Sequence, residues 1–114
     1  MERISKELMG ASSVPIILSL LEIGDSYGYE IMQKVKTLSK GRIVWKEGSI
    51  YPVLKKLETT GLIKSYWKVE GTERPRKYYT IKKDGKKILQ KEIEKWNFML
   101  NIFGKLWNTQ PSSI

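Results

Sequence analysis

A change in hydrophobic period at Gly61 constrains the fold of this chain more than any other sequence feature. Before this glycine, the apolar residues of segment 50–57 recur at helical spacing. After it, residues 63–69 and 77–82 alternate between two faces, as the side chains of strands do. The intervening residues 70–75 contain glycine and proline, which favour a turn. The sequence therefore predicts a third helix followed directly by a two-stranded hairpin.

The predicted third helix has two different faces. Pro52 is tolerated only near a helix N-terminus, so the helix is expected to begin within residues 47–49. The free amides and the positive dipole end at that position can bind a phosphate beside Ser49, although Ser49 could equally cap the helix. The stripe expected to be buried is Ile50, Leu54 and Leu57, with Val53 beside them. The outward face carries Gly48, Tyr51, Pro52, Lys55, Lys56 and Thr59.

The helical spacing of apolar residues in segment 3–23 predicts a first helix with one anomaly. Pro15 lacks an amide hydrogen, so an uninterrupted helix would leave the carbonyl of Ala11 without its partner and would bend there. Alternatively, Ser12 or Ser13 caps a helix that begins near them, with the proline in its first turn. Either arrangement predicts a discontinuity just before the proline.

A second helix is expected between the first helix and the recognition segment. Asp25 or Ser26 can cap it, and it continues toward Gly41. Its early Gly28 is expected to allow close approach of a neighbouring element. Residues 42–46 then connect this helix to the third.

Three helices and a hairpin in this order predict a winged helix-turn-helix, a mainly α fold with a β-hairpin wing, over residues 1–82. In that architecture the third helix enters the major groove, and the hairpin tip reaches the flanking DNA backbone or minor groove. The excess of 21 Lys and Arg over 12 Asp and Glu, a net charge of +9, implies a polyanionic partner. Each cation alone also fits an ordinary solvated surface, so the prediction depends on their combination. The residues expected to contact double-stranded DNA are Tyr27, Gly48, Ser49, Tyr51, Pro52, Lys55, Lys56, Arg74, Arg76 and Lys77.

The absence of cysteine and histidine removes most catalytic chemistry. Without them the chain has no disulfide, no thiolate nucleophile, no imidazole base and no Cys or His zinc site. No Gly-rich phosphate loop and no acidic cluster is evident in the sequence. The expectation is a protein that is not an enzyme and that needs no cofactor or metal.

No segment of the sequence is suited to cross a membrane. The most apolar run, residues 14–23, is shorter than the ~20 residues that a spanning helix needs, and it contains Pro15 and Glu22. The expected location is the cytoplasm, with no membrane partner.

Four segments form a specific combination of motifs. They are GSIYPVLKKLE at 48–58, GLI at 61–63, RPRKYY at 74–79 and YGYEI at 27–31. This combination closely resembles the PadR family of bacterial transcriptional regulators, and the resemblance covers nearly the whole chain. The length of the chain is similar to that of the short subfamily, whose members have a single C-terminal helix. This subfamily includes a lactococcal multidrug-responsive regulator. The resemblance implies a homodimeric repressor that a small molecule releases from DNA.

The last predicted helix, residues 83–107, carries an apolar seam at spacings of four, three, four, three and four residues. A second apolar row lies beside it, and one small domain cannot readily bury both. We therefore expect a dimerisation helix that packs on the first helix and on a partner chain; packing wholly within one monomer is the alternative. Residues 108–114 are expected to form a disordered tail. The seam is Leu89, Ile93, Trp96, Leu100, Phe103 and Trp107, and the second row is Ile88, Met99, Ile102 and Leu106.

The resemblance also implies a flat apolar pore at the two-fold axis, in which Trp96 stacks on planar aromatic drugs. Trp96 equally fits a plain interface position. Glu92 would favour cationic aromatics if it faced the pore, but it also fits a solvated helix position. Val14, Pro15 and Leu100 are bulkier than the resemblance leads one to expect, which would narrow the pore. The expected lining is Leu8, Ala11, Val14, Pro15, Leu89, Glu92, Ile93, Trp96, Met99 and Leu100.

Two other functions remain open from the sequence. A winged domain can serve as a protein-interaction module, and a basic one can bind DNA without sequence preference. The sequence also does not distinguish a repressor from an activator. For a dimeric regulator, the operator would be a pseudo-palindrome whose half-sites lie about one helical turn, ~34 Å, apart.

Overall fold

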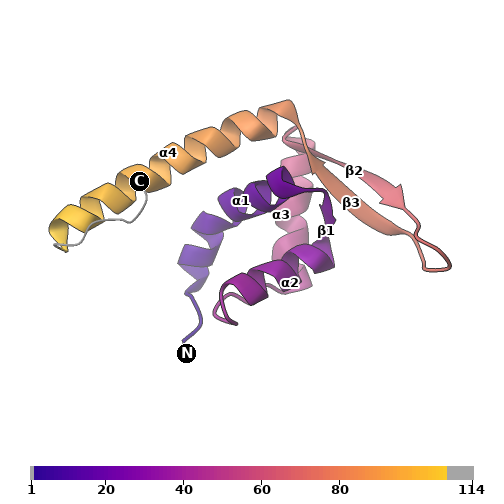
Figure 1. Ribbon diagram of the computed structural model, residues 1–114, viewed down its shortest axis with the longest axis horizontal. Coiled ribbons are helices and arrows are strands. Elements are labelled where there is room, and N and C mark those ends of the chain that lie inside the picture. Colours follow the sequence, from indigo (N-terminus) through magenta and orange to yellow (C-terminus); the bar gives the residue numbers. More distant parts are fainter. Residues whose placement is uncertain (1, 108–114) are drawn as a thin grey trace.

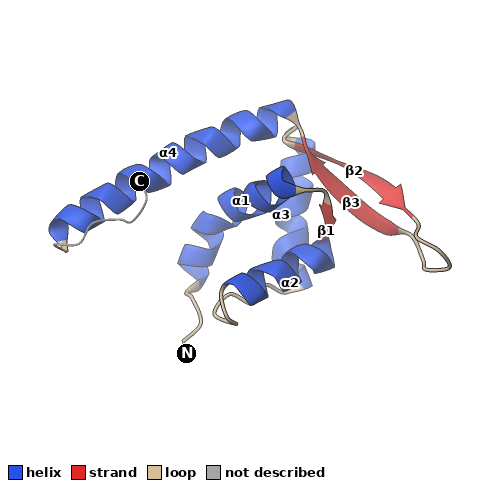
Figure 2. Cartoon of the chain, in the orientation of Figure 1, coloured by secondary structure: helices blue, strands red, loops and turns tan. Residues whose placement is uncertain are grey.

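A computed structural model describes residues 2–107, and it is mainly helical with a small antiparallel sheet (Figures 1 and 2). The predicted winged helix-turn-helix is confirmed, and the proposed tail at 108–114 lies outside the described residues. The elements are α1 (Lys6–Ile23), β1 (Ser26–Tyr27), α2 (Gly28–Leu38), α3 (Glu47–Thr59), β2 (Ile63–Lys68), β3 (Arg76–Ile81) and α4 (Lys83–Leu106).

Helix α1 runs without a break through Pro15, although its axis curves between its two ends (Figure 1). Ser5 caps it, since its hydroxyl accepts a hydrogen bond from the amide of Leu8 at 3.3 Å. The alternative in which Ser12 or Ser13 begins a new helix is therefore wrong. Their hydroxyls instead donate to carbonyl oxygens one turn earlier, at 2.6 and 3.0 Å, which keeps these serines inside the helix.

The sheet contains a third strand that the hydrophobic pattern does not predict. Its strand order is β1-β3-β2, and Ser26 and Tyr27 of β1 pair with the middle of β3. The prediction that Asp25 or Ser26 caps α2 is wrong, because Tyr27 occupies the cap position and no side chain caps the helix. Ser26 is fully buried in the strand, and its hydroxyl lies 2.5 Å from a carboxylate oxygen of Glu30.

A helix-terminating turn at Gly61, the predicted position, ends α3 and leads the chain into the wing. Gly61 has a φ of +82°, a conformation that glycine adopts without steric cost. The amide of Leu62 donates to the carbonyl of Leu57 at 2.9 Å, and that of Gly61 donates to Glu58 at 3.1 Å. These two bonds form a Schellman motif, which satisfies the last carbonyls of the helix and aims the chain into β2.

The core lies where the three short helices meet the sheet. The predicted stripe of α3 is confirmed as buried, with Ile50, Leu54 and Leu57 at 4% exposure or less. Leu89 of α4 joins this core and is 3% exposed. Burying each such side chain contributes about 1.5–3 kcal/mol. The core therefore joins the start of α4 firmly to the winged body.

Helix α4 packs against α1 and then continues past the rest of the molecule (Figure 1). Its outer half leaves large apolar side chains exposed, with exposed fractions of 64% for Phe98, 45% for Leu100 and 72% for Leu106. Among the described residues, no helix is both long and apolar enough to cross a bilayer.

The first turn of α4 packs closely against the backbone of Leu62 through Gly85. A Cβ atom on Gly85 would clash with the carbonyl oxygen of Leu62 and would lie 2.8 Å from Cγ1 of Ile81. We expect Gly85→Ala to lower the free energy of unfolding by about 1–3 kcal/mol, because a backbone carbonyl cannot move aside cheaply. Urea denaturation at fixed protein concentration measures this effect.

Gly10→Ala is the matched control for Gly85→Ala. Gly10 also lies inside a helix, but a Cβ atom there meets no atom within 4 Å. Alanine should therefore stabilise the protein at this position by about 0.5–1 kcal/mol through its helix propensity. Equal effects at the two glycines would contradict the tight contact at Gly85.

Candidate nucleic-acid interface

The outward face of α3 exposes the residues that the sequence assigned to it. Lys55 and Lys56 project into solvent, and within residues 2–107 neither forms an ion pair. Ser49 is also exposed but does not cap the helix, because the cap position is Lys46 and no side chain fills that role. The first-turn amides therefore have no capping side chain in front of them. This end of α3 suits an anion.

The ring of Tyr51 packs over the start of α2. A Cβ atom on Gly28 would lie 2.7–2.8 Å from three atoms of this ring, so only glycine leaves room for it. The prediction that Gly28 allows a close approach is thereby confirmed. Because Tyr51 is 41% exposed, one edge of its ring remains available on the surface.

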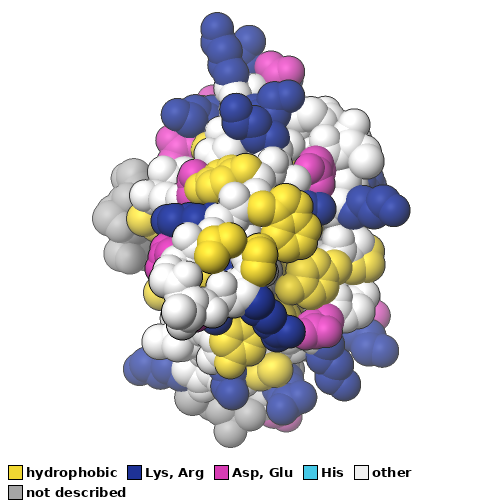
Figure 3. Space-filling model, turned by 90° about the vertical axis from the view of Figure 1, so that its right-hand side faces the viewer, with side chains coloured by type: hydrophobic (Ala, Val, Ile, Leu, Met, Phe, Trp, Pro, Cys, Tyr) yellow, Lys and Arg dark blue, Asp and Glu magenta, His cyan; other side chains and the backbone are white. Residues whose placement is uncertain are grey.

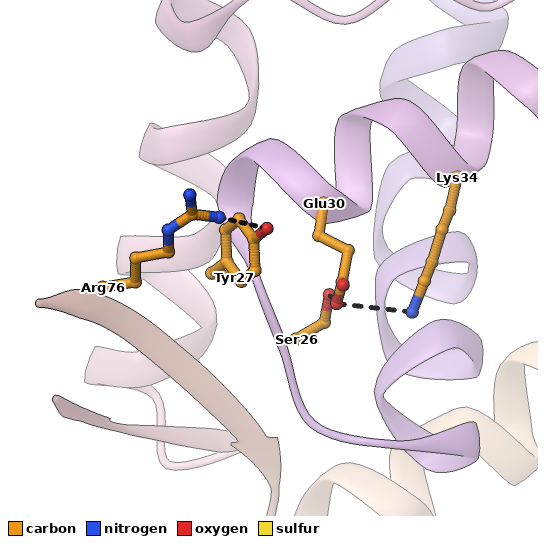
Figure 4. Close-up of polar contacts among 5 residues, drawn as sticks. All are labelled: Ser26, Tyr27, Glu30, Lys34 and Arg76. Atoms are coloured by element: carbon orange, nitrogen blue, oxygen red, sulfur yellow. Dashed lines mark hydrogen bonds and ion pairs between the residues drawn. The ribbon is translucent and has the colours of Figure 1, made fainter. Parts of the chain in front are cut away.

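Arg76 connects the wing to the start of α2 (Figure 4). Its Nη1 donates a hydrogen bond to the hydroxyl of Tyr27, and its guanidinium carbon lies 4.6 Å from the centre of the same ring. The carboxylate of Glu73 is 3.6 Å from Nη2 of this arginine. Arg76 therefore has a structural role in addition to any DNA contact, since it holds the wing against Tyr27.

Lys77 and Arg74 differ in how far their charges are compensated. Nζ of Lys77 lies 3.8 Å from a carboxylate oxygen of Glu58 and 5.7 Å from the ring centre of Tyr79. Arg74 is exposed near the wing tip and forms no ion pair with another residue of the described chain. Of the two cations, Arg74 is thus the more available for contact with a phosphate.

An aromatic cluster fixes the wing to β1. The rings of Tyr66 and Tyr78 stack at 5.8 Å, and Tyr27 meets Tyr78 edge-on at 5.2 Å. The hydroxyl of Tyr66 donates to a carboxylate oxygen of Asp25 at 2.7 Å. This hydrogen bond raises the pKa of Tyr66, so the phenol remains the donor over the physiological pH range.

A groove of about 690 Å³ lies between α2, α3 and the wing. Figure 3 views this side of the molecule, where apolar and aromatic side chains gather with Lys and Arg side chains around them. The acidic side chain of Glu47 also borders the groove, at the start of α3. The predicted DNA-contact residues that the groove brings together are Tyr27, Tyr51, Arg74, Arg76 and Lys77.

Trp67 is a surface residue that the sequence reasoning did not assign to the interface. It lines the groove, is 68% exposed, and lies opposite Lys77 in the β2–β3 register. An indole so exposed beside cations can stack on a sugar or a base. The alternation of residues 63–69 predicted that Trp67 lies on one face of the strand. It did not predict which face the core would leave exposed.

The residues predicted to line a ligand pore lie on α1 and α4. Leu8 and Ala11 are exposed, whereas Val14 and Pro15 are half-buried. On α4, the surface positions are Ile93, Met99 and Leu100, with exposed fractions of 39%, 38% and 45%.

Three other predicted pore residues are more enclosed. Leu89 belongs to the core of the chain itself. The side chain of Glu92 is only 16% exposed, and its carboxylate receives a hydrogen bond from Lys95 at 2.6 Å, so its charge is already compensated. The indole nitrogen of Trp96 is buried without a hydrogen-bond acceptor within the described chain. No group of three or more metal-binding side chains occurs within residues 2–107.

Comparison with known proteins agrees with this geometry. Residues 17–91 match the model of the transcriptional regulator PadR-like family. A transcriptional regulator from Clostridium thermocellum is 35% identical, with a TM-score of 0.79 over 88% of this chain and 97% of the other. A PadR family transcription regulator from Clostridium difficile is 33% identical, with a TM-score of 0.72 over 84% and 98% of the two chains. A PadR-like regulator from Bacillus cereus is 25% identical, with a TM-score of 0.80 over 92% and 100%. These relatives regulate transcription and are not enzymes, and this chain belongs to the PadR-like family of transcriptional regulators.

Proposed function

We propose that the protein is a cytoplasmic, homodimeric repressor that binds a pseudo-palindromic operator. The observation that carries the proposal is the groove in which Tyr51 of α3, Tyr27 of β1 and the wing cations meet on one face. A helix with exposed cations beside a basic wing matches the shape and charge of duplex DNA. Two such faces related by a two-fold axis would read half-sites about one helical turn, ~34 Å, apart.

In this arrangement α3 enters the major groove. Tyr51, Lys55 and Lys56 face the base edges and phosphates, while the first turn of α3 receives a phosphate near Ser49. The wing then follows the flanking backbone with Arg74 and Lys77, and Trp67 lies on the same side. Arg76 sets the angle between wing and helix through Tyr27.

Replacing Lys55 by Ala should weaken operator binding and reduce the salt slope of log K by about one unit, because one phosphate contact is lost. Fluorescence anisotropy with the DNA upstream of its own gene, at several salt concentrations, measures both quantities. Lys87→Ala is the matched control, since Lys87 is an exposed lysine of α4. An unchanged slope for Lys55→Ala would remove this residue from the interface, and equal affinity for random duplex would indicate a sequence-neutral DNA binder.

The exposed apolar face of α4 supports the proposed homodimer. Ile93 and Leu100 are 39% and 45% exposed at seam positions, and Trp107 is 66% exposed with its ring stacked 4.7 Å from that of Phe103. A long helix with this face toward water is unfavourable for one chain alone. Pairing of two α4 helices along the seam removes this surface from water.

Leu100→Glu should convert the dimer into a monomer, because two carboxylates would be buried at the two-fold contact. Analytical ultracentrifugation gives the mass, which is 13.3 kDa for one chain. Leu38→Glu is the matched control: Leu38 is a 75% exposed leucine at the end of α2, away from the seam. A Leu100→Glu protein that remained dimeric would refute the seam as the interface.

We further propose that a planar aromatic molecule binds at this dimer interface and relieves repression. Trp96 supports this because the N–H of its half-buried side chain has no acceptor among residues 2–107. A bound molecule that stacks on the ring and supplies an acceptor would satisfy it. Since Lys95 already pairs with Glu92, a neutral aromatic fits this space as well as a cationic one.

A planar aromatic dye should quench tryptophan emission in the wild type, and Trp96→Ala should remove most of this quenching. Trp67→Ala should retain it, since Trp67 lies in the groove beside the wing. A fluorescence titration measures both variants. Quenching that survives in Trp96→Ala would place the dye elsewhere, and no quenching in the wild type would contradict the ligand proposal.

A further inference from the structure

One carboxylate joins the last turn of α3 to both long strands of the wing. The hydroxyl of Ser65 on β2 donates a hydrogen bond to Oε2 of Glu58 at 2.5 Å. The other oxygen of this carboxylate, Oε1, lies 3.8 Å from Nζ of Lys77 on β3. The two oxygens of Glu58 therefore serve different partners, and the bond from Ser65 fixes the direction in which the other oxygen points.

The strand register places these partners on one face of the wing. Ser65 pairs with Tyr79, and Trp67 pairs with Lys77. Because alternate residues of a strand point the same way, these four side chains share one face, whose end near Ser65 meets the end of α3 (Figure 1). Burial raises the pKa of Tyr79, and the nearby charge of Glu58 raises it further. The carboxylate of Glu58 thus lies on the same face as Trp67 and Lys77, which line the groove.

The two cations of this part of the groove differ in how they meet a phosphate. The charge of Lys77 is engaged by the half-buried Glu58, so a phosphate that binds Lys77 must compete with this carboxylate. Arg74 lines the same groove and forms no ion pair within residues 2–107. An ion pair between partly exposed side chains changes an affinity by only about two- to fivefold. A well-placed phosphate can therefore displace Glu58 from Lys77.

We propose that Glu58 is a selectivity residue, which withholds Lys77 from random duplex and releases it to a phosphate when the operator seats α3 and the wing together. Binding to random duplex depends almost wholly on phosphate contacts, so it lacks the contact that Glu58 withholds. On the operator, base contacts of α3 fix the register and hold one phosphate beside the wing. The contact with Lys77 then becomes intramolecular, which lets the phosphate replace the carboxylate. This inference rests on the proposed function.

Glu58→Gln tests the proposal because it removes the charge but keeps the shape. The amide oxygen of glutamine can still accept the hydrogen bond from Ser65, but it forms no ion pair with Lys77. Affinity for random duplex should rise about two- to fivefold, and the salt slope of log K should steepen by about one unit for each wing that gains a phosphate. Affinity for the DNA upstream of its own gene should rise less, so the preference for that DNA should fall. Fluorescence anisotropy at several salt concentrations measures these quantities.

A double-mutant cycle tests whether Glu58 acts through Lys77. In a Lys77→Ala background, Glu58→Gln should no longer raise the affinity for random duplex. An equal rise in both backgrounds would overturn the proposal, because the carboxylate would then act only by repelling phosphates. Glu94→Gln is the matched control, since Glu94 is an exposed glutamate of α4 and its loss changes the net charge equally. A rise of the same size in Glu94→Gln would likewise overturn the proposal.

Lys77 and Arg74 provide a second test that leaves Glu58 in place. Lys77→Ala should weaken binding to the upstream DNA about tenfold, and binding to random duplex by less than about twofold. Arg74→Ala should weaken binding to both duplexes by similar factors, because its charge is not engaged. Equal losses on the two duplexes in Lys77→Ala would overturn the proposal, even if Glu58→Gln failed to fold.

The same titrations separate this proposal from the proposed function. A wild-type protein that bound upstream DNA and random duplex equally would contradict the operator-binding function, and the selectivity role of Glu58 with it. A wild-type protein that preferred the upstream DNA, with the same preference in Glu58→Gln, would overturn the role of Glu58 alone.

Discussion

The backbone of Leu62 is the junction on which the rest of this structure depends. Its amide ends α3 by donating to Leu57 at 2.9 Å, and its carbonyl accepts the amide of Lys82 at 2.9 Å, where β3 ends. The same carbonyl is the surface against which Gly85 packs at the start of α4. The backbone of one residue therefore joins the recognition helix, the wing and the long helix. Because backbone groups cannot be repacked as side chains can, the relative directions of these elements are tightly constrained.

Two side-chain contacts hold the proposed DNA surface together. Tyr51 joins α3 to α2 through the space left by Gly28, and Arg76 joins the wing to α2 through Tyr27. Tyr27 and Arg76 thus have a structural role and are also candidates for contact with DNA. Lys55, Lys56 and Arg74 carry charges that no described side chain neutralises, which makes them the residues most free to contact phosphates.

The long helix carries the proposed ligand site of this small domain. The site lies along the α4 seam near Trp96, where the apolar face is open to a second chain. Control of DNA binding from the seam would act by altering the spacing of the two recognition helices.

Local sequence patterns were sufficient to determine most of the helices and strands of this protein. Hydrophobic period predicted the stripe of α3, the hairpin and the long C-terminal helix, and Gly61 and Pro52 located the ends of α3, because these signals act within a few residues. The sequence misjudged what depends on distant partners. Ser26 was expected to cap a helix but pairs with β3 instead, because a strand partner 53 residues away satisfies its backbone. Tertiary packing alone likewise decided the exposure of Trp67, the pairing of Glu92 with Lys95 and the burial of Leu89. That packing brings together side chains whose positions in the chain carry no common signal.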